Sequence, residues 1–439
     1  MGLAADVRAS IYEEHLEESS FLHEQRLRFL EDPELCFDDV AEIEARQAAH
    51  LDGLVLGGAQ VRAMCLAQAG RDAGMVHAAL SVFCRQDAQD AANALLEAIT
   101  GAEDPSLLDG ARDALCAELP REWLAWATDG LVGHDCGLLP IWARLAGYRR
   151  LPLGTQLLAA LGRTHHDEPV RAHALWALGE LRETAAEAAL LDALHHDVPG
   201  LARLSAIALL KSGRPLGRGE LAVLVGRSGS LAAIPLAISG MVHREELAAL
   251  ANAAHDTIER GEVLLALGLL GDGRAIPSLL DQLSHAATAA SSAAALYLLS
   301  GAPILETVVI SEPEDAGLDE DLVDPEPAPG DDDQPEAPIR ASTETRLCQD
   351  PARWQCWLAE HAELTTANIP LRMGQVMGVE STLAALGTTV LPLRARAWLS
   401  DDLRTRAHHD LVYQPDMRID QQRAAFCTLA GMHDGTRSA

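Results

Sequence analysis

A pattern of apolar residues that returns about every 30 positions constrains the fold of this chain more than any other feature. In EPVRAHALWALGEL (168–181), apolar residues fall at the i, i+4, i+7 and i+8 spacing of one helical face. The letters Ala-Leu-Gly of residues 177–179 return at 266–268. The same face returns 31 positions later at Leu201, Ser205, Ala208 and Leu209. Each period holds two short helices, which can bury their apolar faces only against neighbouring pairs. The repeat therefore predicts an all-α fold, an α-solenoid of helical hairpins.

The composition agrees with closely packed helices. Hydrophobic residues make up 48% of the chain but aromatic residues only 4%, so most of the apolar content is Ala and Leu. The strand-forming residues Val, Ile, Tyr and Phe are too sparse to supply a large sheet.

The pattern divides the chain into four parts. Two acidic helices, expected at about 6–30 and 38–54, form an N-terminal acidic helical cap over residues 1–58, because the end of a solenoid needs a polar outer face. The apolar residues of the first helix, from Val7 and Ile11 to Leu30, are expected on one stripe. Helical repeats occupy 59–310, and a C-terminal helical segment runs over 339–439.

Residues 311–338 interrupt the helical pattern. They contain twelve acidic residues, six prolines and no basic residue. Burial of such a segment is too costly, so an acidic, proline-rich disordered loop is expected there as an insertion.

The chain is strongly acidic, with a formal net charge of −31. Nucleic-acid binding draws its affinity from Lys and Arg that neutralise phosphates, so no nucleic-acid partner is expected. The densest basic cluster is interrupted by acidic residues and is expected to form ion pairs within the solenoid; it comprises Arg394, Arg396, Arg404 and Arg406. A basic protein is the partner that an acidic surface attracts, and solubility alone is the alternative explanation of the charge.

Targeting signals and cysteine motifs are also lacking. Neither a signal peptide nor an uninterrupted apolar stretch of about 18 residues is evident, and an anionic membrane would repel the chain. A cytoplasmic protein with no membrane partner is therefore expected. The eight cysteines form no C-x-x-C pair, which favours reduced thiols.

Three His-His-Asp clusters invite a metal hypothesis, at residues 165–167, 195–197 and 408–410. Their residue types suit iron or zinc. The first two clusters lie 30 positions apart, which equals the repeat period, so both are expected in the turn between hairpins, with Asp167 and Asp197 capping the following helix. No nucleophile elbow or phosphate-binding loop is present. We therefore expect no cofactor, no metal and no enzymatic activity.

The candidate partner-binding residues are aromatic and acidic. Trp354 and Trp357, beside the acidic segment, are expected to anchor a partner because aromatic side chains are enriched at binding hot spots, and core packing is the alternative. The acidic candidates come from the first helix and from the loop: Glu13, Glu14, Glu17, Glu18, Asp319, Glu320 and Asp321.

Several segments resemble known families. EPVRAHALWALGEL and VLLALGLLGDGRAIPSLLDQL resemble HEAT-like repeats, including the short bacterial kind first described in phycobilisome lyases. The strings EEHLEESSFLHEQR near the start and IPLRMGQVMGVESTLAALG near the end are similar to those of a bacterial family of HEAT-repeat proteins encoded in type VI secretion gene clusters. This resemblance implies an immunity protein that binds and inhibits a cognate toxin, toxins of the nuclease type included.

Two alternatives stay open. The first is an adaptor or chaperone that loads an effector onto the secretion machinery. The second is a metal-dependent or lyase-like enzyme on a HEAT-like fold, since deoxyhypusine hydroxylase is a di-iron enzyme with such a fold. The repeated His-Glu pairs of that enzyme are missing from this sequence.

Overall fold

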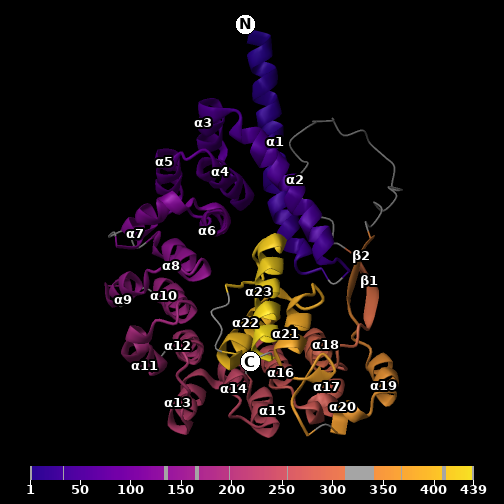
Figure 1. The fold of residues 1–439 in the computed structure, drawn as a ribbon. Helices are drawn as coiled ribbons and strands as arrows, with labels where there is room; N and C mark the ends of the chain where they lie inside the picture. The colour runs from indigo at the N-terminus through magenta and orange to yellow at the C-terminus, as the bar shows by residue number, and fades with distance from the viewer. Residues whose placement is uncertain are drawn as a thin grey trace, which may run out of the picture.

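The computed structural model of the chain describes residues 2–32, 34–132, 137–163, 168–196, 198–254, 256–311, 341–366, 368–407 and 412–437. Most of these residues are helical, and the repeat helices stack in two curved layers, one inside the other (Figure 1). The expected all-α solenoid is confirmed. The outer layer contains α3 (Gly58–Gln68), α5 (Gln89–Ile99), α7 (Leu124–Val132), α9 (Gly154–Arg163), α11 (Glu187–Leu194), α13 (Arg218–Ser228), α15 (Arg244–Ala253) and α17 (Ile276–Gln282). The inner layer contains α4 (Ala73–Arg85), α6 (Ser106–Glu118), α8 (Leu139–Tyr148), α10 (Glu168–Glu180), α12 (Pro199–Lys211), α14 (Ala233–Ser239), α16 (Thr257–Leu270) and α18 (Ala286–Ser300).

Most inner helices end in a left-handed residue. After α4, α8, α10 and α12, the N–H group of the residue that follows donates to a carbonyl oxygen in the last turn, as from Glu183 to Leu178 at 3.0 Å and from Arg214 to Leu209 at 3.1 Å. The left-handed residue helps to reverse the chain toward the next outer helix. The left-handed residues are Asp87, Arg150, Arg182, Gly213, Gly240, Gly271 and Gly301.

Neighbouring inner helices approach each other closely at glycine. A Cβ atom added to Gly179 of α10 would lie 2.7 Å from Cα of Ala208 on α12, and one added to Gly268 of α16 would lie 2.8 Å from Cα of Ala295 on α18. The preceding residues Leu178 and Leu267 are buried, which confirms the register read from the repeat.

The N-terminal cap consists of α1 (Gly2–Phe29) and α2 (Phe37–Val55), packed on α4. Leu16, Leu22 and Leu30 of this region are buried, but Val7 is 53% and Ile11 44% exposed. The prediction of a single apolar stripe is therefore wrong. Position 7 precedes position 16 by about two and a half turns of an α-helix, so it faces the opposite side.

Short strands flank the predicted acidic insertion. β1 (Leu305–Ser311) pairs antiparallel with β2 (Ala341–Leu347), Leu305 opposite Leu347 and Ser311 opposite Ala341. The helical assignment of 339–439 is thus wrong at its start, because β-branched residues of β1 and β2 favour a ladder that whole-chain composition hides. β3 (Leu371–Arg372) and β4 (Gln375–Val376) form a further hairpin. Apart from Ser311, the predicted loop 311–338 lies outside the described residues.

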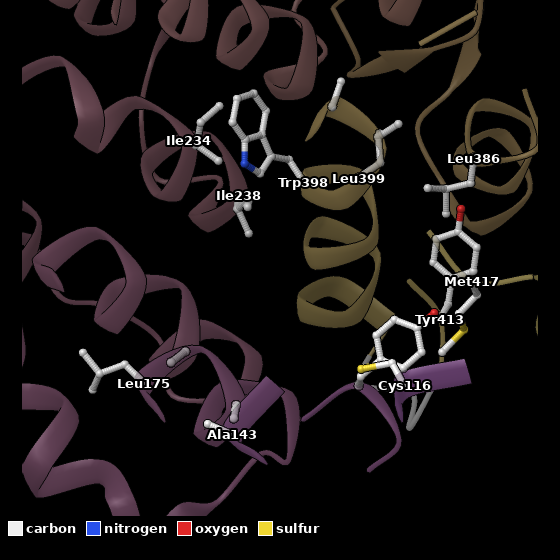
Figure 2. Packing of buried hydrophobic residues seen from close by; sticks show 14 of the residues in the cluster. Cys116, Ala143, Leu175, Ile234, Ile238, Leu386, Trp398, Leu399, Tyr413 and Met417 are labelled. Atoms are coloured by element: carbon white, nitrogen blue, oxygen red, sulfur yellow. The ribbon is translucent and has the colours of Figure 1, made fainter. Parts of the chain in front are cut away.

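Three helices of the C-terminal segment, α21 (Val379–Leu386), α22 (Leu393–Ala407) and α23 (Ile419–Arg437), lie inside the curve of the solenoid (Figure 1). Trp398 of α22 points toward Ile234 and Ile238 of α14 (Figure 2), and α23 contacts α2. The concave side of the repeats is therefore occupied by the chain itself. The other two helices of this segment, α19 (Pro351–Ala359) and α20 (Glu363–Thr366), pack on the last repeat, α19 against α17 and α20 against the 3-10 turn Gly273–Ala275.

One helical stretch of the described residues, Arg218–Ser239, has the length and hydropathy of a membrane-crossing helix. In the fold it is interrupted at Gly229, which separates α13 from a 3-10 turn (Gly229–Ala232) and α14. Since 61% of its apolar window is buried, core packing accounts for its apolar character.

Candidate functional site

The C-terminal segment is attached to the inner layer through a buried carboxylate, Glu180, at the end of α10. Its Oε1 atom lies 2.5 Å from Nζ of Lys211 on α12, and its Oε2 atom lies 2.8 Å from Nη2 of Arg150, which follows α8. Arg404 of α22 forms an ion pair with the same carboxylate, and its Nη2 atom donates to the Glu180 carbonyl oxygen at 2.8 Å. Nε2 of Gln414 donates to Oε2 at 2.9 Å. Three consecutive repeats and the C-terminal segment therefore meet at one side chain.

Burial and ion pairing together set the charge states of this cluster. Burial raises the pKa of a carboxyl group, but the charges of Arg404, Lys211 and Arg150 outweigh it and hold the pKa of Glu180 well below its usual range. Asp401 of α22 lies 2.5 Å from Lys211 on its other side, and burial raises the pKa of Asp401. Lys211 is the only lysine of the chain and is 2% exposed. The ion pairs thus hold α22 in one position along the inner layer.

A second cluster joins the first two helices to the C-terminal segment. Nε of Arg26 on α1 lies 2.7 Å from Oε1 of Glu44 on α2, and Nη2 of Arg26 donates to the carbonyl oxygens of Asp416 and Met417 at 2.9 and 2.8 Å. The Glu44 carboxylate accepts from the N–H group of Ile419, the first residue of α23, at 2.9 Å. The two ends of the chain are therefore joined, and the solenoid closes on itself.

A small cavity of about 40 Å³ lies beside this junction and is lined in part by His23, His77, Asp113, Cys116 and Tyr148. The imidazole rings of His23 and His77 stack with their centroids 3.7 Å apart. Burial lowers the pKa of His23 to about 3 and that of His77 well below its usual value, so both rings are neutral. The volume suits about two or three water molecules, which is too small for an organic substrate.

The two tryptophans expected to anchor a partner have different environments. Trp354 on α19 is fully buried, and its Nε1 atom donates to the Cys348 carbonyl oxygen at 2.7 Å. A partner cannot reach it, so the binding role expected of Trp354 is wrong and core packing explains the residue. Trp357 is only partly buried, and its ring stacks on that of His361 with centroids 3.8 Å apart. Trp357 stays a candidate.

The four glutamates expected to bind a partner lie on α1. Glu13, Glu14 and Glu17 are exposed, and Glu18 is half-buried. Oε1 of Glu17 lies 3.9 Å from Nη1 of Arg71, a solvent-exposed ion pair that contributes little to stability. Residues 319–321, the acidic candidates Asp319, Glu320 and Asp321, fall outside the described residues, so their role stays a prediction.

Of the three His-His-Asp clusters, the structure describes only His195 and His196. Nδ1 of His195 lies 2.8 Å from the carbonyl oxygen of Leu191, and Nε2 of His196 lies 3.0 Å from Nη1 of Arg171. His195 therefore contacts its own helix α11, and His196 contacts the start of α10. Among the described residues, no three His, Cys, Asp or Glu side chains are grouped so that they could hold a metal ion.

Two of the four clustered arginines, Arg404 and Arg406, form the ion pairs expected of this cluster, and Arg396 donates to a backbone carbonyl instead. Arg404 pairs with Glu180, Nε of Arg406 lies 2.5 Å from Oδ1 of Asp402, and Arg396 donates to the Leu30 carbonyl oxygen. Glu180 and Glu44, which pair with buried arginines, and the buried Lys211 were not predicted from the sequence. The signal that could have found Glu180 and Lys211 is a single charge within an apolar run, as in ALGEL and AIALLK.

Comparison with known proteins identifies the repeat. Residues 170–196 match the PBS lyase HEAT-like repeat, and they cover most of α10 and all of α11, an inner helix and the next outer helix. No curated protein and no solved structure matches the chain. HEAT-like repeats suggest a scaffold for protein interaction. The repeat match and the two-layered helical architecture together show that the chain is an all-α solenoid protein with HEAT-like repeats.

Proposed function

We propose that this chain is a cytoplasmic, non-enzymatic immunity protein that binds and inhibits a cognate toxin of a type VI secretion system. The similarity of both chain ends to HEAT-repeat proteins of such gene clusters supports the cellular role. The toxin is expected to be basic, as nucleases that grip DNA are, because the solenoid is acidic.

The observation that carries the proposal is the distribution of charge between interior and surface. Among the described residues, six basic side chains are buried but only three acidic ones. The exposed surface is therefore more acidic than the net charge of −31 alone implies. The buried basic residues are Arg26, Arg171, Lys211, Arg372, Arg396 and Arg404, and the acidic ones are Glu44, Glu180 and Asp402.

The buried polar groups support binding rather than catalysis. The cavity beside His23 and His77 has room only for water, and burial raises the pKa of the Cys116 thiol that lines it far above its usual range. A protonated thiol is a poor nucleophile. These groups pack at the junction of the two chain ends, where residues of α1 and of 416–418 line the same cavity.

Co-expression with the effector encoded beside this gene tests the proposal. The chain should restore growth to cells that express the toxin, and the purified pair should elute as one complex. The rate at which the chain associates with the toxin should fall about tenfold or more from low to high salt, because salt screens the long-range attraction between an acidic and a basic surface. The dissociation rate should change little. If growth is not restored and no complex forms, the immunity role is wrong. Loss of effector secretion in a healthy deletion strain would favour the adaptor instead.

A further inference from the structure

We infer that one exposed face of α1 is the docking surface for a basic amphipathic segment of the protein partner. This face, called the α1 stripe below, consists of Val7, Ile11, Glu14, Glu18 and Phe21. The inference rests on the proposed function and specifies the surface that performs it.

The five residues of the α1 stripe share one side of the helix. They are spaced three or four positions apart, so they lie one above another along a single face. Val7 is 53%, Ile11 44% and Phe21 54% exposed. The opposite side of α1 is committed to the fold, since Leu16 and His23 are buried there. The three apolar residues of the stripe are therefore left about half exposed by the described part of the chain.

The position of α1 makes this face accessible. Its N-terminal turns extend beyond the neighbouring α2 and α3 (Figure 1). Helix stability in proteins comes mostly from packing an apolar face, so a projecting helix with exposed Val, Ile and Phe gains from a partner that covers them.

The concave face of the solenoid cannot serve this purpose in the closed structure. Repeat proteins commonly bind partners in their concave surface. Here Arg404 and Gln414 attach the C-terminal segment to Glu180 on that side, and Arg26 attaches it to α1. A partner must therefore use another surface.

The negative charge of the α1 stripe indicates which kind of segment can bind it. Glu14 and Glu18 lie between the apolar residues, and Glu13 and Glu17 lie beside them. A second copy of the chain would bring these glutamates against their own counterparts, and such like-charge pairing is unfavourable. A segment with apolar side chains flanked by Arg or Lys would cover the apolar residues and pair with the carboxylates. This is the recognition mode in which one amphipathic helix lies on another surface through residues at i, i+3, i+4 and i+7.

The test uses the full chain and a synthetic amphipathic helical peptide with Leu on one face and Lys beside it, and a second peptide with Glu in place of Lys. Binding is followed by fluorescence anisotropy for Ile11→Ser/Phe21→Ser and Glu14→Gln/Glu18→Gln. The apolar control is Met241→Ser/Ile258→Ser, at residues 52% and 68% exposed elsewhere on the solenoid. The acidic control is Glu97→Gln/Glu103→Gln, at exposed residues near α5.

We expect the lysine peptide to bind and the glutamate peptide not to bind. Each α1 double variant should weaken binding about tenfold, the size of effect that one or two hot-spot residues produce, and the controls should leave it unchanged.

Equal weakening by the controls would overturn the inference, and so would a wild-type dimer that Ile11→Ser/Phe21→Ser converts to monomer. If the α1 variants still form the toxin complex and restore growth, the α1 stripe is wrong and the immunity role stands. If they lose the peptide but the wild type never protects cells, the surface stands and the immunity role fails.

Discussion

Three left-handed residues that are not glycine link successive repeats. Asp87, Arg150 and Arg182 have φ values of 53°, 54° and 53°, a conformation that costs a side chain about 1 kcal/mol or more. Two of them reach into the next repeat: Asp87 accepts a hydrogen bond from Nε1 of Trp123 at 2.5 Å, and Arg150 pairs with Glu180. The contacts made by the side chain offset the strain of the backbone.

Glu180→Gln should be among the most damaging single substitutions. It leaves Lys211, Arg150 and Arg404 buried with less negative charge beside them, and loss of one partner of a buried ion pair costs about 3–5 kcal/mol. Thermal unfolding should show a clear fall in midpoint. Glu187→Gln is the matched control in the following helix, because Glu187 is 53% exposed and pairs with Arg214 near the surface. Equal midpoints for the two variants would contradict the role of Glu180.

The buried histidines predict a loss of stability in mild acid. Above pH 6.5, their usual pKa, His23 and His77 are neutral in both the folded and unfolded chain, so they contribute no pH dependence. Below it, the unfolded chain takes up protons first, since the folded-state pKa of His23 is about 3 and that of His77 is also lowered. Each ring then lowers the free energy of unfolding by about 1.4 kcal/mol for every unit by which the pH falls.

Urea unfolding at pH 7.5 and 5.5 measures this effect. His77→Phe keeps an aromatic ring against His23 but removes one of the two titrating rings. It should therefore reduce the pH dependence of the free energy of unfolding by about the contribution of one histidine. The control is His285→Gln at the exposed start of α18, which should leave it unchanged. A pH dependence unaltered by His77→Phe would show that other groups cause it.

At the scale of helices and strands, most of what the sequence could predict came from the local spacing of apolar residues and from helix breaks. The helices expected at 6–30 and 38–54 are α1 (Gly2–Phe29) and α2 (Phe37–Val55), because amphipathic spacing and breaks at proline and glycine act within a few residues. The β1–β2 ladder and the return of α22 onto the inner layer were missed. The contact between Glu180 and Arg404 joins positions 224 apart, and local spacing does not determine which distant charges meet.

Two glycines in helices of the repeats should respond oppositely to the same substitution. Gly179→Ala places a methyl group 2.7 Å from Cα of Ala208, so α10 and α12 must move apart, at a cost of about 1–3 kcal/mol. Gly226→Ala in α13 meets nothing within 4 Å and should be neutral or stabilise by up to about 1 kcal/mol. Chemical denaturation of both variants measures the difference. A stabilising Gly179→Ala would refute the close crossing.

At the scale of the whole molecule, the solenoid is closed rather than open. In an open repeat array each repeat contacts only its neighbours, so the ends unfold independently. Here Arg26 and Glu44 near the start hold the residues around Ile419 near the end. The two ends should therefore open and close together.

Hydrogen exchange of Glu44→Gln tests this coupling. The substitution weakens the contacts to Arg26 and to the start of α23, so amides of α1, α2 and α23 should all exchange about tenfold faster or more, which corresponds to about 1.4 kcal/mol. Amides of α13 and α15, which lie away from these three helices at the bottom of Figure 1, should be unchanged. Acceleration confined to α2 would mean that the ends are not coupled.

The burial of Lys211 has a practical consequence. It is the only lysine, so apart from its amino terminus the folded chain offers no primary amine to reagents in solution. Amine-directed labels and lysine cross-linkers should modify the native protein once at most, and a second label should appear only when α12 separates from α10 and α22. The rate of that second labelling would report directly on how often the buried cluster around Glu180 opens.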